Sequence, residues 1–179
     1  MKKIIALLLV LLLLPAAAIA AQGTDADQWN WEDVSDEVKA QGDYIDLPDF
    51  GFRIWVPGWT AKDVEFAMYG EHCNMVTDEN GLNGFMVESS SSKLFTRENA
   101  AEALKKYADK MFKNYESITI NGIPGIFVPQ SGSDPFQYIR FITDAGMIVI
   151  YMDQPSPKLE RIAPNFFKTM ISSIQLIEK

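Results

Sequence analysis

The sequence predicts an α+β fold in which an antiparallel β-sheet has helices packed on it. Short strand-forming runs are joined by tight turns, and two of these turns hold the Asn-Gly pair typical of hairpins, at 80–81 and 121–122. One longer segment, 97–114, has apolar residues at helical spacing instead. A run at 147–152 is apolar on both faces, which predicts a central strand covered on both sides.

The first 20 residues read as a secretory signal peptide. Lys2 and Lys3 precede an apolar run at 4–14, and small residues ending in Ala18-Ile-Ala20 follow. The run is too short for a membrane span, which needs about 20 apolar residues. We expect cleavage after Ala20 and a secreted, periplasmic or extracellular protein with no membrane span in the mature chain. The alternative is an uncleaved anchor.

The mature chain is acidic and has one cysteine. Without the signal peptide it has 14 basic and 24 acidic residues, a net charge of −10. Such a surface repels nucleic acid and anionic lipid, so neither is an expected partner. Cys73 is the only cysteine, which excludes an internal disulfide. We expect a monomer or a weak dimer.

Residues 21–42 are predicted to be a flexible leader followed by a short helix, and 43–179 to be a single α+β domain. Val34 and Val38 have the i, i+4 spacing of the short helix. Strands are expected at 44–47 and 52–56. The second strand alternates, which places Arg53 and Trp55 together on one of its faces.

The remaining elements follow in order. Strands are expected at 64–68, 73–77, 85–90, 117–120, 123–128, 137–143, 147–152 and 174–177. The helix at 97–114 is expected to turn one face inward, formed by Ala100, Leu104, Tyr107, Ala108 and Met111. A final helix around 159–170 contains Pro164, so it bends there or begins near that residue.

Several motifs resemble the PsbP-like α/β/α sandwich superfamily. They are the strand 52–59 (Phe-Arg-Ile-Trp-Val-Pro-Gly-Trp), one residue shorter than the superfamily pattern, the hairpin 120–125 and the Ser-Ile pair at 173–174. The Trp-Asn-Trp-Glu-Asp segment at 29–33 also resembles the start of small secreted proteins of anaerobic gut bacteria. The superfamily includes adaptor and assembly proteins, so the resemblance implies a binding role. Fold analogy does not establish a function.

Catalytic signals are weak, and we predict neither a catalytic residue, nor a metal, nor a cofactor. His72 and Cys73 are adjacent, so on a strand they point to opposite faces and form no dyad. One histidine and one cysteine fall short of a zinc site. The segment 90–93 matches Ser-x-x-Lys, but at a strand end and in too small a domain for that chemistry. The segment 78–81 is a turn rather than a calcium loop.

The tryptophans offer the least ordinary candidate site. Either the N-terminal segment covers Trp55, with Trp29 or Trp31 packed on it, or an exposed aromatic platform binds a sugar or peptide. The candidate ligand-binding residues are Trp55, Trp59, Arg53 and Tyr138. Tyr138 and Arg140 share one strand face and extend either surface.

We therefore expect a non-enzymatic binding or interaction module whose partner is a protein or a small ligand. The alternatives are a small-ligand or carbohydrate binder that uses Trp55 and Trp59, and a hydrolase.

Overall fold

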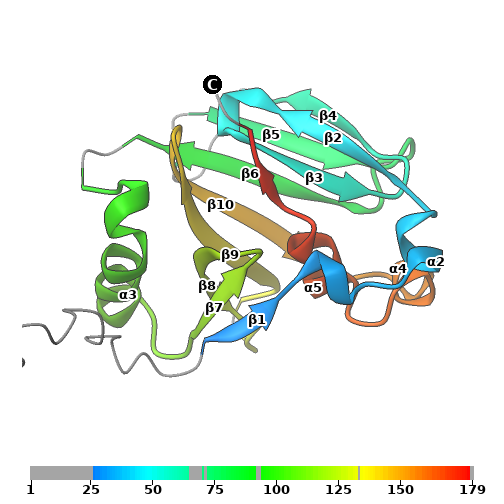
Figure 1. Ribbon diagram of the computed structural model, residues 1–179. Coiled ribbons are helices and arrows are strands. Elements are labelled where there is room, and N and C mark those ends of the chain that lie inside the picture. Colours follow the sequence, from blue (N-terminus) through cyan, green and yellow to red (C-terminus); the bar gives the residue numbers. More distant parts are fainter. Residues whose placement is uncertain (1–25, 65–69, 71, 92–93, 133, 178–179) are drawn as a thin grey trace, which may run out of the picture.

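The computed structural model describes residues 26–64, 70, 72–91, 94–132 and 134–177 (Figure 1). Its larger sheet has eight strands, in the order β1 (Asp27–Trp29), β7 (Glu116–Ile120), β8 (Ile123–Val128), β9 (Phe136–Thr143), β10 (Gly146–Asp153), β6 (Gly84–Ser90), β5 (His72–Thr77) and β4 (Thr60–Asp63). A second sheet has the order β11 (Gln175–Leu176), β3 (Phe52–Val56) and β2 (Asp43–Leu47).

The helical elements are short apart from α3. They are η1 (Trp31–Asp33), α2 (Asp36–Lys39), η2 (Pro48–Phe50), η3 (Arg97–Asn99), α3 (Ala100–Met111), α4 (Pro157–Ile162) and α5 (Phe166–Ser172). No helix in the described ranges is both long and apolar enough to span a bilayer.

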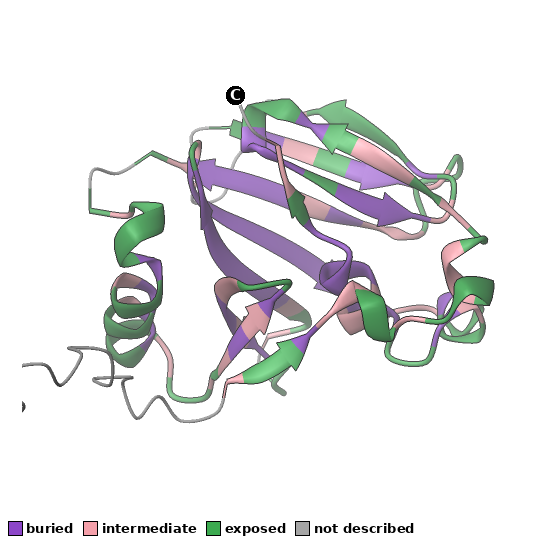
Figure 2. Cartoon of the chain, viewed as in Figure 1, coloured by how far each residue is buried: buried purple, intermediate pink, exposed green. Residues whose placement is uncertain are grey.

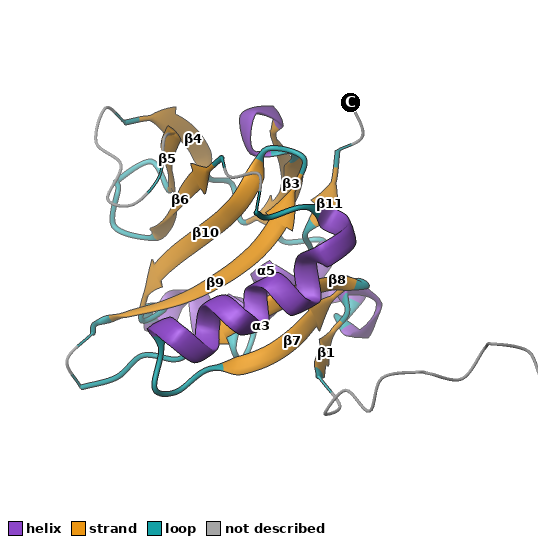
Figure 3. Cartoon of the chain, turned by 90° about the vertical axis from the view of Figure 1, so that its left-hand side faces the viewer, coloured by secondary structure: helices purple, strands orange, loops and turns teal. Residues whose placement is uncertain are grey.

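The larger sheet separates two apolar layers. On one face, α3 packs Ala100, Leu104 and Ala108 against β8 and β9 (Figure 3). The other face carries the main core, formed with the second sheet, α4 and α5. β10 is buried along its whole length apart from Asp153, as its apolar pattern predicted (Figure 2). The α+β class with a large antiparallel sheet is therefore confirmed.

The turn between β7 and β8 also follows the prediction. Asn121 and Gly122 both have positive φ, 47° and 83°. A two-residue hairpin turn of this type requires positive φ at both central residues. Asn and Gly adopt positive φ at lower cost than other residues.

The N-terminal segment differs from the expected leader and helix. Asp27–Trp29 forms β1, which lies parallel to β7 at the edge of the larger sheet. The expected helix is reduced to η1 and α2, since Val34 lies in extended backbone between them. A three-residue strand has no periodicity to read, and its partner lies about 90 residues further along the chain.

Other boundaries also shift. The strand expected at 64–68 falls mostly outside the described residues, and β4 precedes it at Thr60–Asp63. The C-terminal helix is interrupted, as Pro164 predicted, and α5 restarts after Asn165 in the left-handed region at φ 55°. Met111, expected to face inward, is 54% exposed.

Candidate functional site

The structure does not support the alternative of an exposed tryptophan platform. Trp55 is 1% and Trp59 is 4% exposed, and both belong to the core between the two sheets. The ring of Trp31 packs on Trp55 at 5.7 Å between centroids, so the covered alternative is the one observed. The N-terminal segment covers Trp55 because the indole of this residue is a large apolar surface on β3, the middle strand of the second sheet.

The other two candidate residues lie elsewhere. Arg53 is exposed on β3, where its Nε donates to Asp46 at 3.0 Å and its guanidinium lies over Tyr44. Tyr138 is on the opposite face of the larger sheet, in the α3 layer. The four predicted residues therefore do not form one site, and of the four only Tyr138 lines the pocket between α3 and the larger sheet that is described below.

His72 and Cys73 do not form a nucleophilic pair. They are successive residues of β5, with His72 exposed and Cys73 buried. Burial raises the pKa of the Cys73 thiol to about 11, and the nearby Glu88 carboxylate adds to the shift. A thiol with this pKa stays protonated and unreactive at neutral pH.

The remaining sequence signals yield no chemistry. Ser90 ends β6, and Lys93 of the Ser-x-x-Lys match lies outside the described residues. Asp78 caps the turn that follows β5, accepting from Leu82 N and Asn83 Nδ2. Among the described residues, no group of three or more His, Cys, Asp or Glu side chains is placed to hold a metal.

A pocket of about 680 Å³ opens between α3 and the larger sheet. α3 packs mainly on β8 and β9 (Figure 3), and the pocket lies beside this contact, where residues of β9, β10 and β6 line it. Two exposed hydrophobic side chains, Met111 at the end of α3 and Phe136 at the start of β9, line it. The volume is within the range of small-molecule sites.

One side of the pocket is a continuous series of aromatic contacts, here called the aromatic wall. It runs in the order Phe95, Tyr107, Phe112, Tyr138 and Tyr151. Neighbouring ring centroids are 5.7 to 6.1 Å apart. Most of the contacts are edge-to-face, an arrangement that aromatic pairs prefer over a face-to-face stack.

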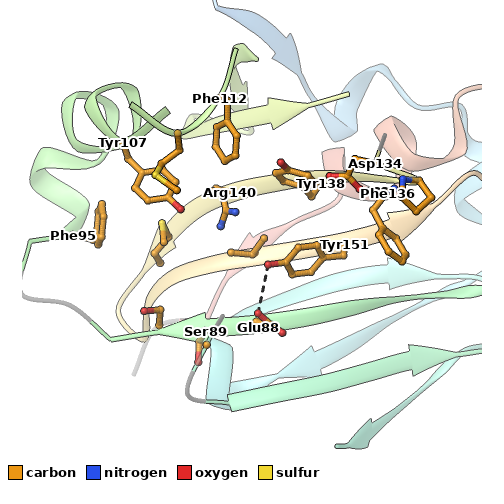
Figure 4. A pocket seen from close by; sticks show the side chains of 16 residues that line it. Glu88, Ser89, Phe95, Tyr107, Phe112, Asp134, Phe136, Tyr138, Arg140 and Tyr151 are labelled. Carbon is orange, nitrogen blue, oxygen red and sulfur yellow. Dashed lines mark hydrogen bonds between the residues drawn. The ribbon is translucent and has the colours of Figure 1, made fainter. Parts of the chain in front are cut away.

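Arg140 lies at the base of this wall (Figure 4). It is 6% exposed, and its guanidinium carbon is 5.3 Å from the ring centroids of Tyr107, Phe112 and Tyr138. Its Nε is buried with no hydrogen-bond partner, and no described carboxylate forms an ion pair with it. Cation–π contacts compensate only part of the cost of burying this charge.

Glu88 is the second buried charge of the pocket. It is 1% exposed on β6, and the Tyr151 hydroxyl donates to its Oε2 at 3.4 Å (Figure 4). Val149 of β10 pairs with Arg140 on one side and Glu88 on the other, so the three residues form one row across the sheet. Directly paired residues point to the same face, so both charges face the pocket.

The alternation of the sequence places Tyr138 and Arg140 on one strand face, but Glu88 was not among the predicted site residues. The sequence does contain a signal for Glu88, because this charged residue directly follows the apolar residues Phe85, Met86 and Val87 within one strand. A charge within such a strand needs a partner or a function. To relate Glu88 to Arg140, however, one must know that β10 alone separates β6 from β9 in the sheet. The order of the strands along the chain does not indicate this.

Comparison with models of known protein families gives no match, and comparison with curated proteins gives none either. Among solved structures, the chain is similar to the solution structure of cyanobacterial PsbP from Synechocystis sp. PCC 6803. The sequences are 16% identical, and the TM-score is 0.47 over 76% of this chain and 93% of that one.

Proposed function

We propose that the protein is a non-enzymatic binding module that holds a small carboxylate-bearing organic molecule in the pocket between α3 and the larger sheet. The proposal rests above all on Arg140, a buried cation that faces the pocket with its Nε unpartnered. A charge that is buried without a partner lowers stability, and a bound anion would remove that cost.

The rings around Arg140 support a carboxylate as the bound anion. Tyr107, Phe112 and Tyr138 surround the guanidinium at equal distance, and Nε has no hydrogen-bond partner in the described part of the chain. An arginine approached along one edge presents two parallel N–H donors, which match the two oxygens of a carboxylate.

The rest of the ligand is expected to be apolar. The aromatic wall, Val149 and Met147 form most of the surface beyond Arg140, and Met111 and Phe136 extend it to solvent. A mostly apolar pocket with a few placed polar groups is typical of small-molecule sites. Most of the lining residues are apolar or aromatic, which favours an apolar ligand over a polar sugar.

The remaining parts of the proposal come from the sequence. The signal peptide predicted at 1–20 supports a protein that acts outside the cytoplasm after cleavage. The pKa of the Cys73 thiol is high, and His72 points to the other face of β5. Both observations support binding rather than hydrolysis. In this view the sheet holds the ligand and performs no reaction on it.

The direct test compares an acid with its alcohol. Binding of 3-phenylpropionate and of 3-phenylpropan-1-ol to the mature protein is measured by isothermal titration calorimetry. We expect the acid to bind at least about tenfold more tightly, because a hydrogen bond to a charged group contributes about 1.5–3 kcal/mol. Arg140→Met should abolish that difference.

Arg97→Met is the matched control, since Arg97 is a half-exposed arginine outside the pocket that pairs with Asp144. It should leave the preference for the acid intact. Equal affinity for the acid and the alcohol, or an acid preference that survives in Arg140→Met, contradicts the proposal.

A further inference from the structure

We infer that the apolar part of the ligand is an unbranched aliphatic chain, so that the ligand is a medium-chain fatty acid whose carboxylate meets Arg140. The chain lies along β9 and β10 in the direction of Phe136. This inference rests on the proposed function and adds the class of the apolar part and its direction in the pocket.

The floor of the pocket is formed by alternate residues of two antiparallel strands. Phe136, Tyr138 and Arg140 line it from β9, because side chains two residues apart point to the same face of a sheet. On β10, Val149 pairs with Arg140. Tyr151 pairs with Tyr138. The floor therefore contains a track, here called the floor track, that leads from Arg140 through the two tyrosines to Phe136.

The floor extends unequally on the two sides of Arg140. On one side the floor track follows β9 as far as Phe136, a Cα-to-Cα distance of about 13 Å in an extended strand. On the other side a single row, Ile142 with Met147, precedes the turn that follows Thr143. A carboxylate at Arg140 therefore leaves the longer stretch of floor on the Phe136 side, where an extended substituent can lie parallel to the strands.

The surface along the floor track is apolar as far as the mouth of the pocket. The rings of Tyr138 and Tyr151 are in contact in its middle, with centroids 5.7 Å apart. At its outer end Phe136 is 37% exposed, and Met111 of α3, also exposed, lines the same pocket (Figure 4). Covering such exposed apolar surface is favourable. A chain that reaches Phe136 gains this contact, whereas a short aromatic acid ends over the two tyrosines.

The first test varies the length of the chain. Affinities of the mature protein for butanoate, hexanoate, octanoate and decanoate are measured by isothermal titration calorimetry. We expect the affinity to rise about threefold with each added methylene, because each buried methylene contributes a similar increment. Decanoate should therefore bind at least about a hundredfold more tightly than butanoate.

Two further probes test the shape and the polarity of the chain. Nonanoate has as many carbon atoms as 3-phenylpropionate but a longer reach, and it should bind at least about tenfold more tightly. Octanedioate differs from octanoate by a second carboxylate at the far end. It should bind at least about tenfold more weakly than octanoate, because a charge placed on an apolar surface loses its hydration.

Phe136→Ala removes the outer end of the floor track. It should lower the affinity for decanoate about fivefold or more and leave the affinity for hexanoate within about twofold, because the shorter chain ends before this residue. Leu82→Ala is the matched control, since Leu82 is an exposed apolar residue between β5 and β6 that does not line the pocket. It should change neither affinity. Equal losses for both acids in Phe136→Ala overturn the inferred direction of the chain.

The outcomes separate the two proposals. If acids bind but any of the three wild-type ratios falls short, the fatty-acid inference is overturned and the carboxylate pocket stands. If no acid of either kind binds the wild-type protein, both proposals are overturned. The wild-type measurements alone decide between these cases should Phe136→Ala fail to fold.

Discussion

The indole Nε1–H of Trp55 donates a hydrogen bond of 3.0 Å to the carbonyl oxygen of Lys39, the last residue of α2. Trp55 is on β3, and its backbone N–H donates to the Ser173 hydroxyl at 2.8 Å. One core side chain therefore connects the N-terminal segment to the second sheet, and its backbone connects that sheet to the end of α5.

Replacing Trp55 tests this connection. Trp55→Phe keeps an aromatic ring, loses the hydrogen bond to Lys39 and leaves a partial cavity. We expect the free energy of unfolding to fall by about 2–3 kcal/mol, measured by urea denaturation. Trp31→Phe, at a half-buried indole whose ring packs on Trp55, should cost less. Equal costs for the two variants would contradict this account.

Asn121 makes a second long-range connection, from the β7–β8 turn. Its Oδ1 accepts from Trp31 N at 2.9 Å. Its Nδ2 donates to Ser172 O at 2.7 Å and to Ile174 O at 2.9 Å. We expect Asn121→Gly to destabilise the fold by about 1–3 kcal/mol, because it removes these bonds while tolerating the positive φ.

Asn121→Ala separates the hydrogen bonds from the backbone conformation. It loses the same bonds and also places a Cβ at φ 47°. A left-handed non-glycine residue costs roughly 1 kcal/mol more, so Asn121→Ala should be the less stable variant by that amount in thermal or urea unfolding. If Asn121→Gly is as stable as the wild type, the three hydrogen bonds contribute nothing.

The local patterns of the sequence predicted much of the fold. The strand at 52–56, the Asn-Gly turn at 121–122 and the central strand at 147–152 each depend on neighbouring residues alone, and each is present. β1 was missed because its pairing with β7 joins segments far apart in the sequence. Helical periodicity placed Met111 inward, but at the end of α3 the pocket separates the helix from the sheet, so Met111 lines the pocket and is 54% exposed.

The candidate site was less accessible to prediction for the same reason. Tyr138 and Arg140 were noted because their alternation is local. Their relation to Glu88 depends on strand order, since β10 lies between β9 and β6. The sequence offered the tryptophans as a ligand platform, yet Trp55 and Trp59 are buried in the core, where large apolar rings contribute most to packing.

The thiol of Cys73 predicts a pH dependence of stability. Its pKa in the folded protein, about 11, is above the ordinary value of 9.0 because of burial and then Glu88. The folded state therefore binds the proton more tightly than the unfolded state. The stabilising contribution is complete below about pH 9 and is lost as the pH rises through 11.

Urea unfolding at pH values from 8 to 11 measures this effect. We expect the wild type to lose about 2 kcal/mol more than Cys73→Ala over this range, since one pKa unit corresponds to about 1.4 kcal/mol. Lysine and tyrosine titrations affect both proteins alike and cancel in the difference. Parallel curves for the two proteins would mean that Cys73 is not shifted in the folded state.

The last prediction concerns the cost of keeping Arg140 buried. If its guanidinium serves a ligand, the ligand-free protein should not depend on it for stability. Arg140→Met retains an apolar side chain of comparable length and removes a charge whose Nε has no partner. Buried charges replaced by well-packed apolar groups are often neutral or stabilising.

We therefore expect the free energy of unfolding of Arg140→Met, refolded from urea without ligand, to stay within about 1 kcal/mol of the wild type or to exceed it. Leu104→Ala, in the same layer and 1% exposed, should lose about 2–5 kcal/mol and shows that the layer responds to real packing losses. A loss above about 2 kcal/mol in Arg140→Met would mean that the contacts with Tyr107, Phe112 and Tyr138 are structural. Arg140 would then be part of the core, and the pocket would lack its anion site.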